Sequence, residues 1–270
     1  MNPATQGHTI SRGSFLAARP YPESRACLMG VPLDVSTSFR GGTREAPLKV
    51  REVSDDLEEY AVELDRDLAD HPLADVGDVD LPPGNRDLAL ARIGAAMDEL
   101  LADAKLPIIV GGEHLITLPL VAATLKRYPE LRVIHLDAHA DLRDTYLGER
   151  LTHATVLRRV AELIGDHRLY QFGVRSAVRE EVDYGRAEQF LTTVEVLEPV
   201  RRLLSSHGLA GYPVYLTIDI DVVDPAFAPG TGTPEPGGIS SRELLETVRL
   251  LAEGGVRLVA ADVVEIAPPR

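Results

Sequence analysis

Two short segments concentrate the side chains that could do chemistry. The D-A-H-A-D segment at 137–141 and the D-I-D segment at 219–221 place carboxylates or an imidazole at alternate positions. Because the side chains of a strand alternate between its faces, each segment would point its polar groups the same way. Such groups repel one another and are costly to desolvate without a counter-charge. A bound divalent metal supplies that charge, so we interpret both segments as metal-binding.

Two further residues extend this pattern. His114 follows the Gly-Gly-Glu segment at 111–113, and Glu265 follows an apolar segment at 256–264. Each signal is weak alone, because a lone Asp-x-Asp is more often a turn and a lone histidine more often packs in a core. Together they favour one shared site. The six candidate metal ligands are His114, Asp137, His139, Asp141, Asp219 and Asp221.

The donor atoms of these residues indicate which ions would fit. Imidazole nitrogens and carboxylate oxygens without thiolate suit Mn²⁺, Fe²⁺, Co²⁺ or Zn²⁺ and disfavour a structural zinc site. Six ligands exceed the need of one tetrahedral ion, so two metals with bridging carboxylates are the better interpretation. His135 lies further inside the same predicted strand as Asp137, and we interpret it as a hydrogen-bonded core histidine.

Short apolar strands that alternate with amphipathic helices must position these groups. The pattern predicts strands at 27–32, 106–110, 132–137, 169–174, 214–221 and 256–264. It predicts helices at 47–60, 87–105, 118–127, 152–164, 194–207 and 240–253. This alternation indicates an α/β fold, a three-layer sandwich with a mainly parallel sheet and helices on both faces. In such sheets the ligand site lies at the carboxyl ends of the strands, where the polar segments fall.

Length and composition narrow the class of protein. The 270 residues are 44% hydrophobic, which excludes a disordered chain, and no apolar run is long enough for a membrane span. The net charge of −14 argues against nucleic acid and anionic membranes as partners. A single cysteine, Cys27, fits a reducing cytoplasm. We expect an N-terminal arm at 1–20 and a single domain at 21–270.

Five segments resemble the ureohydrolases, the arginase–agmatinase family of binuclear manganese enzymes. The resemblance runs from about Cys27 to the end of the chain, and the pattern D-L-R-D-x-Y-x-G is most similar to prokaryotic agmatinases. The segments are SFRGGTREAP (38–47), GGEHLIT (111–117), HLDAHADLRD (135–144), TIDIDVVDPAFAPGTGTPEPGG (217–238) and DVVEIAPP (262–269). The resemblance implies the arginase-like fold, two Mn²⁺ ions per subunit and a homo-oligomer, a trimer or hexamer.

The resemblance also implies a role for each candidate residue. One manganese would be held by His114, Asp137, Asp141 and Asp219. The other would be held by His139, Asp137, Asp219 and Asp221, with Asp137 and Asp219 bridging. His153 matches a histidine that shuttles protons and acts on the leaving amine, and Glu265 matches the carboxylate that binds the substrate guanidinium. Asp141 would accept a proton during hydrolysis.

The substrate implied is a small cationic guanidino compound, foremost agmatine, which would give putrescine and urea in polyamine biosynthesis. Arginases use other residue types at the positions of Arg143 and Val178 to bind the amino-acid end of arginine. This difference counts against arginine as the substrate. N1-aminopropylagmatine stays an alternative, and so does 4-guanidinobutyrate, whose carboxylate Arg143 could pair with. Three acidic residues could form a wall around a cationic tail: Asp144, Glu149 and Glu180.

Two other classes of protein remain as alternatives at this stage. A non-catalytic polyamine-binding relative is disfavoured by the intact ligand set. A single-zinc deacetylase-like enzyme is disfavoured by His114, Asp141 and Asp221 as additional ligands. The chain stops at Arg270, where family members usually continue through a closing helix. We therefore expect either a partner subunit over the sheet surface there or a destabilised protein.

Overall fold

Nine strands form one continuous sheet. The computed structural model describes residues 8–206 and 208–268. In sheet order the strands are β1 (Thr9–Ile10), β5 (Leu73–Val79), β2 (Ala26–Val31), β6 (Leu106–Gly111), β11 (Arg257–Val264), β10 (Pro213–Asp219), β7 (Arg132–Leu136), β8 (Leu169–Val174) and β9 (Phe190–Thr193). β1 pairs antiparallel with β5, and the other pairings in this sheet are parallel. The predicted mainly parallel sheet is confirmed.

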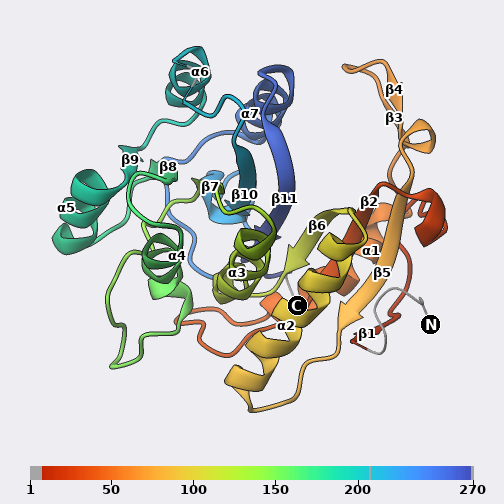
Figure 1. The fold of residues 1–270 in the computed structure, drawn as a ribbon, viewed down its shortest axis with the longest axis horizontal. Helices are drawn as coiled ribbons and strands as arrows, with labels where there is room; N and C mark the ends of the chain where they lie inside the picture. Colours follow the sequence, from red (N-terminus) through yellow and green to blue (C-terminus); the bar gives the residue numbers. More distant parts are fainter. Residues whose placement is uncertain (1–7, 207, 269–270) are drawn as a thin grey trace.

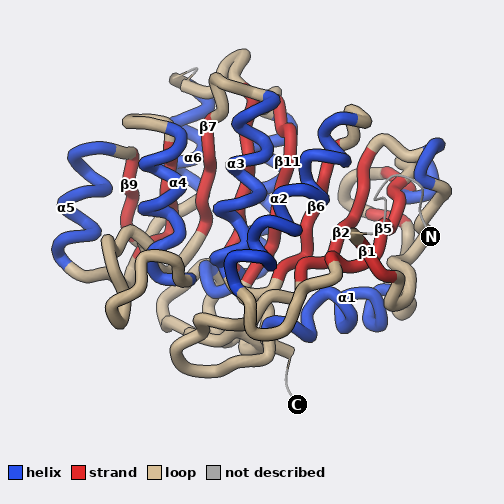
Figure 2. Tube along the Cα trace, turned by 60° about the horizontal axis from the view of Figure 1, so that its bottom comes forward, coloured by secondary structure: helices blue, strands red, loops and turns tan. Residues whose placement is uncertain are grey.

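Helices cover both faces of the sheet. One face carries a row of four that Figure 2 shows side by side: α2 (Arg86–Ala102), α3 (Thr117–Arg127), α4 (Val156–Ile164) and α5 (Arg179–Glu188). The other face carries α1 (Ala46–Ser54), α6 (Leu197–Ser205) and α7 (Ser241–Glu253) (Figure 1). Apolar side chains of α2, α3 and α4 share a core with β2 and β6, and those of α6 and α7 share another with β7, β8 and β10. The predicted three-layer sandwich is confirmed.

The longest helix shows how local sequence sets an element. In α2 the fully buried side chains of Ile93, Met97 and Leu100 recur at helical spacing and face the core. Asn85 caps the helix, because its side-chain oxygen accepts a hydrogen bond from the backbone N–H of Leu88 at 3.0 Å. The 87–105 segment therefore folds much as its apolar stripe predicts.

One predicted helix is too long. The helix expected at 47–60 ends at Ser54, and a hairpin of β3 (Tyr60–Ala61) and β4 (Arg66–Asp67) follows. Side chains such as Leu57 and Val62 are more than half exposed in this segment. Because they contact no core, nothing holds the additional helical turn in place.

Several elements were not predicted from the sequence, among them β5 and α5. β5 reads L-A-D-V-G-D-V, and the buried side chains of Asp75 and Asp78 interrupt its apolar pattern. Most residues of α5 are charged, so its buried face is only a narrow stripe that includes Glu181 and Gly185. Both elements depend on tertiary contacts that a local pattern does not contain.

The N-terminal arm is only partly described by the structure. Residues 1–7 lie outside the described residues, while Thr9 and Ile10 pair with Val79 and Asp78 of β5. The division into an arm at 1–20 and a single domain at 21–270 stays a prediction. No helix in the described part of the chain is long and apolar enough to cross a membrane.

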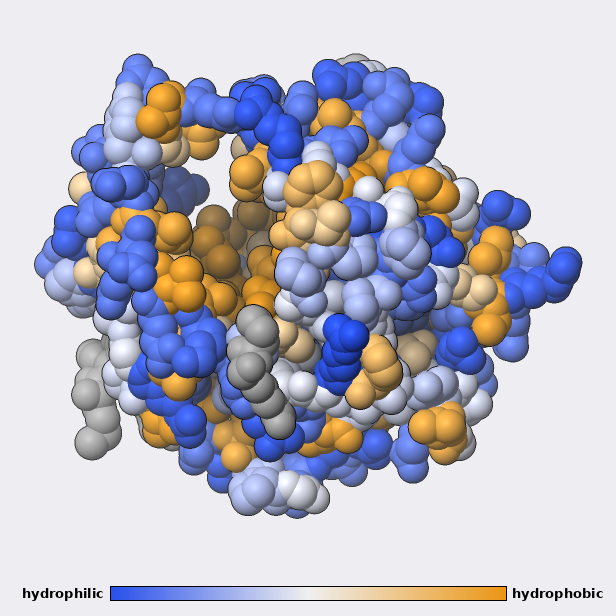
Figure 3. Space-filling model, turned by 180° about the vertical axis from the view of Figure 1, so that it is seen from behind, coloured by the Kyte–Doolittle hydropathy of each residue, from blue (hydrophilic) through white to orange (hydrophobic). Residues whose placement is uncertain are grey.

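The back of the molecule is hollowed between the β3–β4 hairpin and α7. Figure 3 shows apolar side chains in this hollow, and the residues that line it include Val62, Leu64 and Leu245. Val62 is 79% exposed and Leu245 70% exposed. An ion pair between Arg242 and Glu63 at 2.5 Å joins α7 to the hairpin across the hollow.

Candidate metal centre

Four neighbouring strands deliver the six candidate ligands and Glu265 to one edge of the sheet. β6, β11, β10 and β7 are adjacent in the sheet, and their carboxyl ends point the same way. His114 begins a short turn after β6, and the segment 137–141 follows β7. Asp219 ends β10, and Glu265 follows β11. The convergence expected from the sequence is therefore present.

Three carboxylates surround the side chain of His114. Its Nδ1 atom lies 3.1 Å from Asp141 Oδ2, 3.2 Å from Asp137 Oδ2 and 3.4 Å from Asp219 Oδ2. All four side chains are less than 10% exposed. The four residues gathered here are the same four that were predicted to hold the first manganese.

His139 and Asp221 form the other half of the cluster. His139 Nδ1 lies 3.0 Å from Asp221 Oδ2 and 3.5 Å from Asp137 Oδ1. Asp137 thus faces His114 with one carboxylate oxygen and His139 with the other. That position suits the bridging role predicted for Asp137, and the ligand roles themselves stay predictions.

The cluster fits a pair of divalent cations on chemical grounds. His114 Nδ1 is buried and makes no hydrogen bond, although three carboxylates aim at it. Burial, together with the charge of Asp137, raises the pKa of Asp141 to about 7. Burial and the neighbouring carboxylates also raise the pKa of Asp219 well above its usual range. The four aspartates outnumber the two candidate histidines, so protonated imidazoles alone would not balance their charge. Two imidazoles with four carboxylates are donors that divalent cations accept.

Hydrogen bonds behind the cluster orient its histidines. His114 Nε2 lies 3.1 Å from Thr217 Oγ1, which leaves Nδ1 toward the carboxylates. His135 is close enough to His114 and Asp137 to join a metal site. However, its Nε2 lies 2.7 Å from Asp137 Oδ2 and its Nδ1 lies 2.9 Å from Gln171 Nε2. Because both ring nitrogens are engaged, His135 behaves as the hydrogen-bonded core histidine that the sequence predicted.

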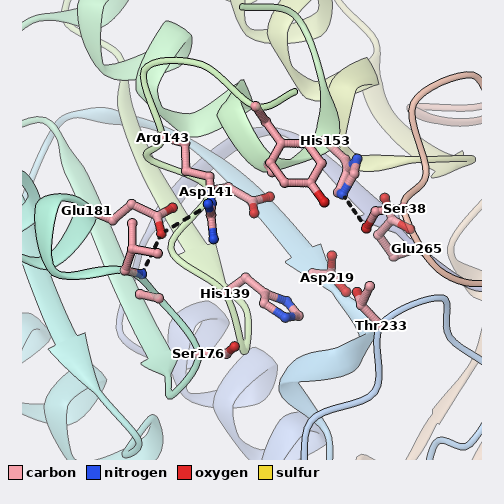
Figure 4. A pocket seen from close by; sticks show the side chains of 14 residues that line it. Ser38, His139, Asp141, Arg143, His153, Ser176, Glu181, Asp219, Thr233 and Glu265 are labelled. Carbon is pink, nitrogen blue, oxygen red and sulfur yellow. Dashed lines mark hydrogen bonds and ion pairs between the residues drawn. The ribbon is translucent and has the colours of Figure 1, made fainter. Parts of the chain in front are cut away.

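A pocket opens directly above the cluster. His139, Asp141, Asp219, His153 and Glu265 all line it (Figure 4). Glu265 Oε1 accepts a hydrogen bond from the backbone N–H of His114 at 2.7 Å, and burial raises the pKa of Glu265 to about 8. Asp141 and Glu265 also have positive φ angles, 52° and 59°. Backbone strain of this kind is typical of positions that a functional site constrains.

His153 lies at the rim of the pocket between two serines. Its Nε2 is 3.2 Å from Ser38 Oγ, and its Nδ1 is 3.5 Å from Ser36 Oγ. The ring of Tyr146 meets the imidazole edge-on. Burial lowers the pKa of His153 to about 4, so the ring is neutral at pH 7. A neutral imidazole can accept a proton at one nitrogen and donate one from the other.

Glu113 holds the loop that carries these serines, a role that no sequence motif indicated. The carboxylate is fully buried. It accepts hydrogen bonds from the backbone N–H groups of Val35 and Ser36 at 2.6 and 2.7 Å, and from Ser36 Oγ at 2.7 Å. Ser36 Oγ in turn accepts the backbone N–H of His153 at 3.0 Å. Glu113 lies 77 positions from Ser36, and Ser36 lies 117 positions from His153, so no local pattern connects these residues.

None of the three acidic residues expected around a substrate tail lines the pocket. Asp144 pairs with Arg159 at 2.7 Å, and Glu149 pairs with Arg86 at 3.1 Å. Glu180 lines a separate hollow beside α5. These pairings turn Asp144 and Glu149 outward, so the wall that the sequence suggested does not form.

Comparisons with known proteins agree with this site. The chain is 49% identical to an agmatinase of Bacillus subtilis over 94% of this chain and 88% of the relative. It is 36% identical to a guanidinobutyrase of Pseudomonas aeruginosa, over 90% and 79% of the two chains. The solved agmatine ureohydrolase of Thermoplasma volcanium has a TM-score of 0.85 at 29% identity, covering 96% of this chain and 87% of that one.

Fold, site and relatives together define a ureohydrolase enzyme, of a class built around two metal ions. The chain belongs to the arginase family, whose model matches residues 24–270. The predicted resemblance to ureohydrolases, and to prokaryotic agmatinases in particular, is confirmed. The deacetylase-like alternative receives no support from these matches.

Proposed function

We propose that this protein hydrolyses agmatine to putrescine and urea with two Mn²⁺ ions per subunit. The observation that carries the proposal is the 49% identity to an agmatinase across nearly the whole chain. The clustering of two histidines and four aspartates beneath a pocket supports it independently. The ion is written as Mn²⁺ because the family resemblance implies it.

Three residues of the pocket would have separate roles in this reaction. Glu265 lies at the pocket wall and would pair with the cationic guanidinium, which orients its central carbon over the cluster. Asp141 would accept a proton at its carboxylate. His153 would pass a proton to the leaving amine through its ring nitrogens, positioned by Ser36 and Ser38. The ions, when bound, supply Lewis-acid chemistry that lowers the pKa of water toward neutrality.

A urea-release assay with purified protein tests this proposal. The protein is stripped with a chelator, reloaded with Mn²⁺ and assayed against agmatine, with metal content measured on the same sample. We expect urea in step with bound manganese and none after chelation. The proposal fails if the loaded protein, shown to hold two ions per chain, releases no urea from agmatine.

A carboxylate-tailed guanidine is the second candidate substrate. The pocket is lined by Arg143, and the guanidinobutyrase relative is 36% identical. An N1-aminopropylagmatine ureohydrolase of Thermococcus kodakarensis is 37% identical over 91% of this chain. The assay therefore includes 4-guanidinobutyrate, N1-aminopropylagmatine and arginine, and we expect agmatine to give the highest kcat/KM.

The assembly and location of the protein belong to the same proposal. We propose a homo-oligomer, a trimer or hexamer, which the family resemblance implies, and a cytoplasmic location, which the single Cys27 favours. Light scattering of the purified protein measures its oligomeric state. A monomer at micromolar concentration would overturn the proposed trimer or hexamer.

A further inference from the structure

The outer part of the pocket holds one cation and one anion side by side. Arg143 and Glu181 both line it, with Arg143 Nε 3.7 Å from Glu181 Oε2 (Figure 4). The guanidinium of Arg143 also lies 5.4 Å from the centre of the Tyr146 ring. Among the described residues, Glu181 is the carboxylate that pairs with Arg143. The two charges therefore nearly cancel at this end of the pocket.

Glu181 is held rigidly in the pocket wall. Its side chain is 4% exposed, against 37% for that of Arg143. Glu181 Oε1 accepts the backbone N–H of Leu142 at 3.0 Å, and Oε2 accepts the backbone N–H of Val178 at 2.8 Å. Because both oxygens are bound to backbone, the carboxylate cannot turn away from the pocket. Its charge acts on whatever occupies the space beside Arg143.

We propose that Glu181, by neutralising Arg143, makes the pocket select amine-tailed over carboxylate-tailed guanidines. This inference rests on the proposed function and names the residue pair that sets its specificity. With Glu181 in place, a substrate carboxylate must compete with a fixed carboxylate for Arg143. An ammonium tail would lie beside the Arg143–Glu181 ion pair, which repels it less than an unpaired arginine would. Charge pairs that are partly removed from water act strongly at such short range.

Single-charge substitutions on each side of the pair should shift specificity in opposite directions. The ratio of kcat/KM for agmatine to kcat/KM for 4-guanidinobutyrate is measured for each variant. Glu181→Gln leaves Arg143 unpaired, so we expect this ratio to fall about tenfold. Arg143→Gln leaves the carboxylate unpaired, so we expect the ratio to rise by a similar factor. The double variant should return toward the wild-type ratio, because each single effect depends on the other charge.

Two controls separate specificity from damage. Glu180→Gln removes the same charge from the neighbouring position of α5, outside this pocket, and should leave the ratio unchanged. The Glu181→Gln side chain keeps one oxygen that can accept a hydrogen bond from a backbone N–H. If it still disturbs the fold, Arg143→Gln tests the inference alone, since no hydrogen bond from Arg143 to backbone supports the described structure.

The outcomes also separate this inference from the proposed function. The inference is overturned if both substrates change equally in Arg143→Gln and Glu181→Gln while the wild type hydrolyses agmatine. If the metal-loaded wild type releases urea from neither substrate, the proposed function is what fails.

Discussion

At the scale of single residues, Asp137 connects the two halves of the candidate centre. Its two carboxylate oxygens face His114 and His139, and its backbone follows the last residue of β7. Glu265 lies at the same strand edge, but it contacts the backbone of His114 rather than the imidazole. These positions predict different consequences when each acid is removed.

Asp137→Ala should abolish binding of both metal ions, because Asp137 faces both His114 and His139 in the candidate metal centre. Glu265→Ala should keep the metal and raise the KM for the guanidino substrate, because it removes only the partner of the guanidinium. Metal content per chain by mass spectrometry, together with kcat and KM, measures both effects. Two ions retained in the first variant, or an unchanged KM in the second, would contradict the assignments.

His153 should make the protein acid-sensitive through its low pKa. In the folded chain this pKa is about 4, because the ring is buried, against about 6.5 in the unfolded chain. Between those values the unfolded chain binds the proton and the folded chain does not, so stability falls as the pH is lowered from about 6.5 to about 4. His153→Gln removes this contribution. Urea unfolding of chelated protein at pH 7 and pH 4.5 should show a smaller loss for the variant than for the wild type, and parallel losses would contradict it.

At the scale of elements, a buried ion cluster joins α1 to β5. Arg51 of α1 bonds Asp75 with two nitrogens at 2.6 and 2.8 Å, and Asp78 with a third at 2.6 Å. Gly30 of the neighbouring strand makes room for it, since a Cβ there would lie 1.9 Å from Asp78 Oδ1. Charges buried this deeply must all be paired, so the cluster fixes how α1 sits on the sheet.

Arg51→Met should destabilise the protein by about 3–5 kcal/mol, because it removes the buried cation that pairs with the buried carboxylates of Asp75 and Asp78. Lys49→Met on the same helix breaks an exposed pair with Glu52 and should change stability little. Chemical unfolding curves give both free energies. Equal effects of the two substitutions would show that burial of the Arg51 cluster does not matter.

At the scale of the whole molecule, the surplus of acidic residues should steer cationic substrates. The net charge is −14, and this total includes the four aspartates and Glu265 that gather at one edge of the sheet. Long-range attraction of this kind is screened by salt, with a Debye length of about 8 Å at physiological ionic strength. The acidic charge of the whole molecule would thus raise the rate at which a cationic substrate reaches the pocket.

The kcat/KM for agmatine should therefore fall about two- to fivefold as ionic strength rises from about 0.01 to 0.15 M. The value for 4-guanidinobutyrate, which has no net charge, should change less. Initial rates at low substrate concentration measure both, with sucrose as a control for viscosity. An equal salt response of the two substrates would argue against steering.

The sequence alone predicted that strands and helices alternate in the centre of the chain and that the candidate ligands converge at one edge of the sheet. Asp137 directly follows strand 132–136, and Asp219 ends strand 213–219. Both strands are largely apolar, and both signals are local. Because parallel strands share one carboxyl edge, knowing the fold class was enough to bring their polar ends together. The long apolar stripe of α2 likewise predicted a helix from local sequence alone.

Tertiary structure alone decided which polar residues outside those segments reach the pocket. Asp144 and Glu149 resembled a substrate wall in sequence, yet arginines from α4 and α2 draw them away. Glu181 of α5 lines the pocket instead. Glu113 does not line it, but it holds the loop of Ser36, which lies 77 residues away in sequence. Charged side chains pair with the partners that folding brings near, and those partners come from segments that lie far apart in sequence, so no local pattern records them.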